Sequence, residues 1–184
     1  MTNTFRNLTL GLLSTLSVVT PSAQAGYQYE GIQLMEGSDF GQYSQLAGDM
    51  INSLNHMGVP VIDGGYEKLP ICQPEGDSYT LGYYVPSQNY MVICTNVSNH
   101  SEQFETLTHE VVHVIQDART GINNDSLHAG SDIYLRQLVN GLPEYKVNTI
   151  ASLYDESDWD VEVEAFYFET RPVEVATELR KFAF

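Results

Sequence analysis

The sequence predicts an α+β domain in which a small sheet with a hairpin precedes a mostly helical second half. The strongest strand signal lies in residues 79–85 and 90–95, two runs rich in aromatic and β-branched side chains. The turn sequence Pro-Ser-Gln-Asn at 86–89 joins them, which predicts a β-hairpin. After the hairpin, apolar side chains recur mainly at helical spacing, so most of the remaining chain is expected to be helical.

The first expected helix covers residues 39–57, where Leu and Met side chains recur at helical spacing. Asp39 and Gln42 resemble a capping box at its start. The other expected elements are an extended segment at 27–35, short strands at 59–62 and 69–72, and helices at 132–139, 144–154 and 172–184.

A helix that begins after a cap at Asn99 or Ser101 carries the motif H-E-x-x-H, formed by His109, Glu110 and His113. Because residues four apart share a helix face, the two imidazoles are expected to lie side by side, where one Zn²⁺ can reach both. Glu110 lies about 100° round the helix, close enough to act on water at the metal rather than to bind the metal.

This helix, expected to run to about Arg119, is amphipathic. With His109 taken as the origin, its apolar side chains fall at about 140° to 240°, opposite the histidine pair. One face would pack on a core and the other would face a cleft. This favours the zinc interpretation over a core helix with two hydrogen-bonded histidines. The apolar positions are Phe104, Leu107, Val111, Val114, Ile115 and Ala118.

A catalytic zinc site needs a third protein ligand, and residues 159–170 contain Glu162, Glu164 and Glu169. In a helix, Glu164 is set apart among apolar neighbours, whereas the other two share a face about 140° to 160° away. A buried carboxylate without a partner is costly, so Glu164 is the expected ligand. A strand, which the Val-Glu alternation also suits, would leave the acids in solvent. The alternative ligands are Glu162, Glu169, His128 and Asp132.

These motifs resemble the gluzincins, the thermolysin-like H-E-x-x-H peptidases whose third ligand is a Glu in an E-A-rich helix. The resemblance rests on His109 and His113 followed far downstream by Glu164 and Ala165, and it covers roughly residues 79–170. The first motif is specific, and the Glu motif is weak.

The residues after the second histidine refine the resemblance. Asp117 matches the thermolysin pattern H-E-x-x-H-x-x-x-D, and Gln116 is similar to the H-E-x-x-H-x-x-Q of small bacterial exported metallopeptidases. The chain departs from thermolysin at Phe168, where the pattern has an acid. The metzincin pattern is excluded, because its Gly and third His positions hold Gln116 and Arg119.

The resemblance implies a compact zincin-like domain over residues 26–184, acting as a zinc-dependent metallopeptidase on a peptide or protein substrate. Zn²⁺ would be held by His109, His113 and Glu164, and Glu110 would be the general base. An extended substrate is expected to add to the hairpin's edge strand. Candidates for stabilising the oxyanion are Tyr145, Tyr154, Tyr167 and His128.

Two other functions stay open at this stage. The first is a binding module on a zincin scaffold without turnover, although the retained Glu110 argues against it because a pure zinc site needs no base. The second is an acidic exported structural domain without a metal, in which the histidines are only hydrogen bonded.

Residues 1–25 have the form of a signal peptide. Arg6 supplies the positive region, residues 8–19 are mostly apolar, and an A-x-A cleavage site ends at Ala25. The apolar stretch is too short and too polar for a stable membrane anchor. The mature chain is expected to begin at Gly26 and to be secreted or periplasmic.

The charge of the mature chain excludes some partners. Arg6 is the only charged residue of the leader, so 7 of the 8 basic residues remain against 24 acidic ones, a net charge of −17. Such a surface repels nucleic acids and anionic membranes.

Two cysteines occur, Cys72 and Cys94. In an exported protein the expected state is one disulfide between them. It would close a loop of roughly 20 residues, worth about 3 kcal/mol in the loop-entropy model.

Overall fold

The computed structural model contains a short parallel pair, β1 (Asn7–Leu8) with β3 (Ser78–Tyr79). The rest of the predicted leader and its cleavage site lie outside the described residues. The structure describes residues 7–8, 31–76, 78–122 and 126–184.

The main sheet has three strands in the order β2-β5-β4. β2 (Val61–Asp63) is parallel to β5 (Tyr90–Ile93), and β4 (Gly82–Val85) is antiparallel to β5. The predicted hairpin is therefore confirmed. Its turn is a 3-10 helix (Pro86–Gln88) followed by Asn89 at φ 54°, in the left-handed region that Asn tolerates better than most residues.

One predicted strand is wrong. The segment expected to be extended at 69–72 is instead a 3-10 helix, Pro70–Cys72, in which the carbonyl of Pro70 accepts a hydrogen bond from the amide of Gln73 at 3.0 Å. The reason is local, since proline has a fixed φ and no N–H and therefore suits the first position of a helical turn.

A disulfide joins Cys72 to Cys94, with the two Cα atoms 5.2 Å apart. Cys94 directly follows β5, so the bond ties the 3-10 helix that ends at Cys72 to the end of the central strand. The predicted pairing is confirmed, and a disulfide is compatible with an extracellular location.

Helix α1 (Ser44–His56) begins later than expected, because a 3-10 helix, Gly37–Tyr43, precedes it. Gly41, within this 3-10 segment, has φ 56° and ψ −120°, a conformation that glycine adopts most readily, and it kinks the segment before α1 begins. The capping box at this entrance pairs Asp39 with Glu36, whose backbone N–H donates to the Asp39 carboxylate at 2.7 Å. The expected capping box of Asp39 with Gln42 is therefore wrong.

The motif helix is α2 (His100–Ala118). Asn99 caps it: its Oδ1 accepts hydrogen bonds from the backbone N–H groups of Ser101 at 2.9 Å and Glu102 at 3.2 Å. The Glu102 carboxylate accepts in return from the Asn99 N–H at 2.9 Å. This capping box fixes where α2 begins and contributes about 1 kcal/mol.

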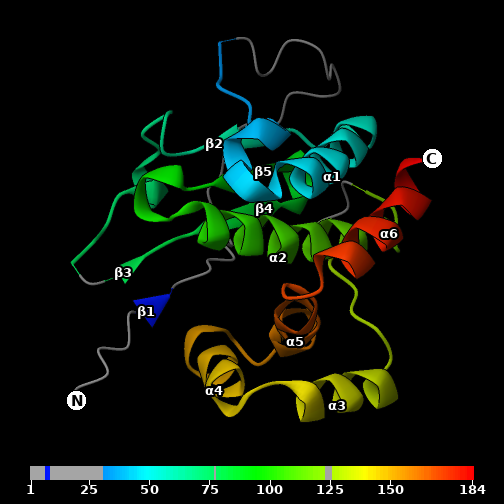
Figure 1. The fold of residues 1–184 in the computed structure, drawn as a ribbon. Helices are drawn as coiled ribbons and strands as arrows, with labels where there is room; N and C mark the ends of the chain where they lie inside the picture. The colour runs from blue at the N-terminus through cyan, green and yellow to red at the C-terminus, as the bar shows by residue number, and fades with distance from the viewer. Residues whose placement is uncertain (1–6, 9–30, 77, 123–125) are drawn as a thin grey trace.

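Figure 1 shows α2 running through the middle of the molecule, with the sheet and α1 on one side and three later helices on the other. The expected helical second half is confirmed, and the predicted boundaries agree to within two residues. The later helices are α3 (Asp132–Gly141), α4 (Glu144–Leu153), α5 (Trp159–Phe168) and α6 (Pro172–Ala183).

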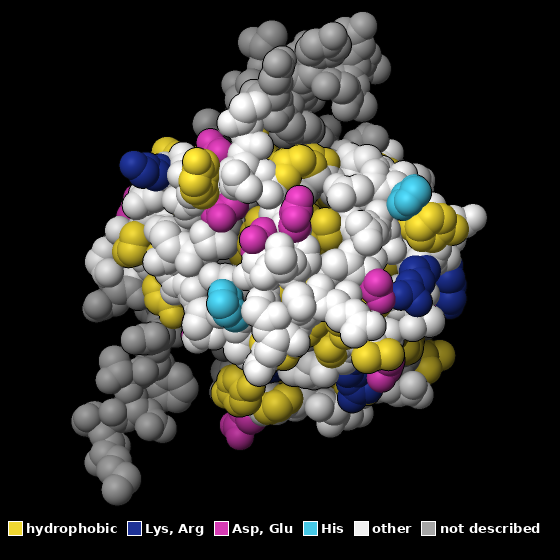
Figure 2. All heavy atoms as spheres, turned by 45° about the horizontal axis from the view of Figure 1, so that its top comes forward, with side chains coloured by type: hydrophobic (Ala, Val, Ile, Leu, Met, Phe, Trp, Pro, Cys, Tyr) yellow, Lys and Arg dark blue, Asp and Glu magenta, His cyan; other side chains and the backbone are white. Residues whose placement is uncertain are grey.

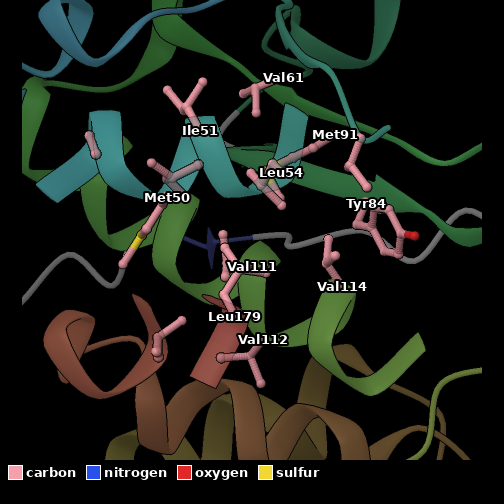
Figure 3. Packing of buried hydrophobic residues seen from close by; sticks show 14 of the residues in the cluster. Met50, Ile51, Leu54, Val61, Tyr84, Met91, Val111, Val112, Val114 and Leu179 are labelled. Atoms are coloured by element: carbon pink, nitrogen blue, oxygen red, sulfur yellow. The ribbon is translucent and has the colours of Figure 1, made fainter. Parts of the chain in front are cut away.

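The apolar face of α2 packs into the main core, as predicted. Figure 3 shows Val111 and Val114 of α2 facing side chains of α1 and the sheet. Each buried side chain of this size contributes about 1.5–3 kcal/mol. The partners in this cluster include Met50, Ile51, Leu54, Val61, Tyr84, Met91 and Leu179.

A second apolar cluster lies on the other side of the molecule, where α3 and α4 pack on α5. Its buried members are Leu81, Leu135, Leu138, Ile150, Val163 and Phe166. Because the apolar side chains of α5 are held there, Glu162 and Glu164 of the same helix face α2.

Charged side chains are spread over the surface. On the face shown in Figure 2, Asp and Glu lie in several separate places among mostly uncharged groups. Within the described part of the chain, no helix combines the length and apolar character needed to cross a membrane.

The disulfide should contribute measurably to folding stability. Replacing Cys72 and Cys94 together by Ala should lower the free energy of unfolding by about 3 kcal/mol, because the broken link frees a loop whose ends are 22 residues apart. Urea unfolding of both proteins measures the difference. An unchanged midpoint at an unchanged m-value would contradict this prediction.

Candidate metal centre

His109 and His113 lie side by side on α2, as their spacing predicts. Their Nε2 atoms are 3.2 Å apart and both side chains are almost fully buried. Two ring nitrogens at this distance need a hydrogen or a metal ion between them, since two bare lone pairs would repel each other. The pair can therefore hold either a proton or a metal ion.

Glu162 of α5 completes the group. Its Oε2 is 3.4 Å from Nε2 of His109, and its Oε1 is 3.5 Å from Nε2 of His113. One ligand atom from each of the three residues lies within 4.8 Å of the others, so the group could hold a metal ion. Oε2 of Glu162 is buried and has no hydrogen-bond partner among the described residues. Such an atom is costly unless a cation accepts its lone pairs.

The structure does not bring Glu164 to the histidine pair, and Glu162 takes the place in the group that was expected for Glu164. Glu164 is paired with Arg119 through two hydrogen bonds of 2.7 and 2.9 Å. The predicted helix is correct, and so is the shared face of Glu162 and Glu169. The face shared by Glu162 and Glu169 lies against the histidines. Glu164 needs no metal ion, because Arg119 supplies the positive charge that its buried carboxylate requires.

Glu169 holds the first histidine from behind. Nδ1–H of His109 donates to its carboxylate at 2.7 Å, and the ammonium of Lys146 on α4 donates to its other oxygen. Although burial raises the pKa of Glu169, the hydrogen bonds and charges of His109 and Lys146 hold it below the usual value. Glu169 is therefore an ionised acceptor, which leaves Nε2 of His109 free to bind a metal.

Gln116 holds the second histidine. Nδ1–H of His113 donates to Oε1 of Gln116 at 2.8 Å, one turn further along α2. Nε2 of His113 is therefore also free, and both Nε2 lone pairs face the Glu162 carboxylate.

The buried charges around the site do not balance. Arg119 and Lys146 are already engaged by their acids, and Glu110 and Glu162 have no Lys or Arg partner in the described part of the chain. Two buried carboxylates thus lack compensation. Burial lowers the pKa of His109, but the nearby carboxylates raise it well above its usual value, so the site attracts positive charge. A divalent cation matches this deficit.

Glu110 is buried next to the group. Burial raises the pKa of its carboxyl, while the charges of His113 and His109 and a hydrogen bond to the backbone of Tyr84 lower it. Tyr84 is in β4, so this contact joins the motif helix to the edge of the sheet.

Among the proposed oxyanion partners, Tyr154 lies at the site. Its hydroxyl is buried without a hydrogen-bond partner among the described residues, and burial and the charges of Glu162 and Glu110 raise its pKa. Tyr145 is 59% exposed, and Tyr167 packs against Arg171.

Two other residues singled out in the sequence, His128 and Asp117, form hydrogen bonds with protein groups. The carbonyl of His128 accepts a hydrogen bond from Arg119 at 3.0 Å. Asp117, which matches the thermolysin pattern, accepts a hydrogen bond from the Tyr84 hydroxyl at 2.7 Å. His128 and Asp132 lie outside the group that could hold a metal ion.

No protein-family model matches this chain, and neither a curated protein nor a solved structure does. The gluzincin resemblance therefore rests on the motifs alone, and the evidence for the site is its geometry.

If the three residues bind a metal, losing Glu162 should remove it. Glu162→Gln should weaken zinc binding by more than the ~10- to 100-fold that loss of an outer hydrogen-bond partner costs. Zinc affinity and bound zinc per chain are the measurements. Glu156→Gln, an exposed change just before α5, is the control and should leave both unchanged. Equal affinity in the two variants would contradict the assignment of Glu162.

Proposed function

We propose that this protein is an exported zinc-dependent metallopeptidase with a zincin-like arrangement of α2 and the sheet. The observation that carries the proposal is the convergence of the two Nε2 atoms and the unpaired Glu162 oxygen beside Glu110. Two imidazoles and a carboxylate are the donor set of catalytic zinc sites that keep one position for water.

Zn²⁺ held by His109, His113 and Glu162 would lower the pKa of a water molecule toward ~7 and polarise the scissile carbonyl. The protein's own task is to present the three ligand atoms to one point. Glu169 and Gln116 support this by holding each Nδ1 in its protonated form.

Glu110 is the proposed general base. Its carboxylate would take a proton from the attacking water and pass it to the leaving amine. Burial favours this proton transfer, because it raises the pKa of the carboxyl toward the working pH. Tyr154 is the proposed partner of the oxyanion, since its hydroxyl is a buried donor near Glu110 and Glu162.

The substrate is proposed to lie along β4. The strand is at the edge of the three-stranded sheet and contacts α2. An extended peptide could add there by main-chain hydrogen bonds, and the backbone contact between Tyr84 and Glu110 would bring it near the base.

Export is proposed from the leader-like residues 1–25 and is supported by the disulfide. The rival functions fit the site less well. A binding module has no use for a buried carboxylate at Glu110, and a metal-free domain would leave two buried carboxylates to be neutralised by protons alone.

The proposal is tested by Glu110→Gln, which keeps the size of the side chain and removes the base. Peptide hydrolysis should fall ~10²- to 10⁴-fold while bound zinc stays unchanged. A mixture of internally quenched peptides gives the rate, and metal analysis gives the zinc content. Glu156→Gln is the control.

Full activity in Glu110→Gln would show that another group is the base. Wild-type protein that binds zinc but hydrolyses none of the peptides would contradict the enzymatic proposal and favour the binding module.

A further inference from the structure

Helix α2 and helix α5 are joined by a chain of hydrogen bonds that ends at a metal-binding histidine. It runs from Arg119 through Glu164 and Gln116 to His113. We propose that Glu164, fixed by Arg119, is a positioning residue that locks His113 in the tautomer with its proton on Nδ1. This inference rests on the proposed metal site and concerns how that site is kept ready.

The amide of Gln116 can have only one orientation. Its Nε2 donates to the carbonyl of Val161 at 2.9 Å and to Oε2 of Glu164 at 3.0 Å. Both partners are acceptors only, so the two hydrogens of the amide nitrogen are used. Rotating the amide by 180° would put its oxygen against two other oxygens.

The orientation of the amide decides the tautomer of His113. With Nε2 of Gln116 engaged, Oε1 faces Nδ1 of His113 at 2.8 Å. An amide oxygen only accepts, so Nδ1 must carry the hydrogen. Nε2 of His113 then carries the lone pair that points at Glu162 and His109, as metal binding requires.

Arg119 fixes the Glu164 carboxylate in the position from which it accepts from Gln116. Its guanidinium donates to both oxygens of Glu164 at 2.7 and 2.9 Å and to the carbonyl of His128 at 3.0 Å. The two-point contact fixes the carboxylate, and because both of its oxygens accept from Arg119, Glu164 offers only an acceptor to Gln116. A neutral amide at position 164 could turn either its oxygen or its nitrogen toward Gln116.

His109 is held by a single direct hydrogen bond. His109 donates directly to the Glu169 carboxylate, and no amide lies between them. A change at Glu164 should therefore act on His113 and leave His109 as it is. A general loss of structure would affect both rings.

The test is Glu164→Gln in the mature protein. Nitrogen-15 NMR of the metal-free protein at alkaline pH reports the tautomer of each histidine. We expect His113 to change from the Nδ1-protonated form to a mixture of tautomers, and His109 to stay unchanged. Zinc affinity should fall ~10- to 100-fold, as for other lost outer hydrogen-bond partners.

The reciprocal variant, Gln116→Glu with Glu164→Gln, is the rescue. The carboxylate at position 116 offers His113 only acceptors, and the amide at position 164 can donate to it while accepting from Arg119. The net charge is unchanged. His113 should return to the Nδ1-protonated form. Zinc affinity should return only in part, because one carboxylate oxygen then faces the Val161 carbonyl, to which Gln116 donates in the wild type. Because the rescue is measured by itself, the proposal stays testable if Glu164→Gln alone folds poorly.

A wild-type tautomer and affinity in Glu164→Gln would overturn the proposed role of Glu164, and so would a reciprocal variant in which His113 is not protonated on Nδ1. Failure of the proposed function is distinguishable. If wild-type protein binds no zinc, the metal site fails, and the role of the lock in keeping that site ready fails with it. If zinc binds and His113 is not protonated on Nδ1 in the wild type, only the lock fails.

Discussion

The structure depends on the close contact of two ring nitrogens inside the protein. Nε2 of His109 and Nε2 of His113 are 3.2 Å apart, and a carboxylate with an unpaired oxygen faces them. Because both Nδ1 atoms donate to other residues, this place must hold a further proton or a metal ion. Burying such a group is costly, and the apolar face of the same helix offsets that cost by packing on α1 and the sheet.

Three acids, from α5 and the turn after it, each have a different partner at the site. Glu162 faces the ring nitrogens, Glu169 holds His109, and Glu164 acts on His113 through Gln116. Two of these acids are matched by Lys146 and Arg119, which come from elements on either side of α5. The remaining negative charge, from Glu162 together with Glu110, is what suits the site to a divalent ion.

Local patterns in the sequence predict much of this. The spacing of His109 and His113 fixes their common face, and Asn99 marks the start of their helix, because both depend on neighbours along the chain. The choice between Glu162 and Glu164 depends on which side of α5 meets α2. Arg119 settles that question from 45 residues away in sequence, and helical geometry alone does not reveal the contact. Lys146, which pairs with Glu169, likewise belongs to another helix, so the sequence around Glu169 does not reveal this contact.

We propose that one divalent ion lies between His109, His113 and Glu162. A crystal structure of protein grown with zinc, with anomalous data on both sides of the zinc absorption edge, tests it most directly. A single strong peak is expected about 2.0–2.2 Å from both Nε2 atoms and from an oxygen of Glu162, with the pair of Arg119 and Glu164 intact. A site between the histidines without a peak, or a zinc ion bound by Glu164 after its separation from Arg119, would show that the proposed metal centre is wrong.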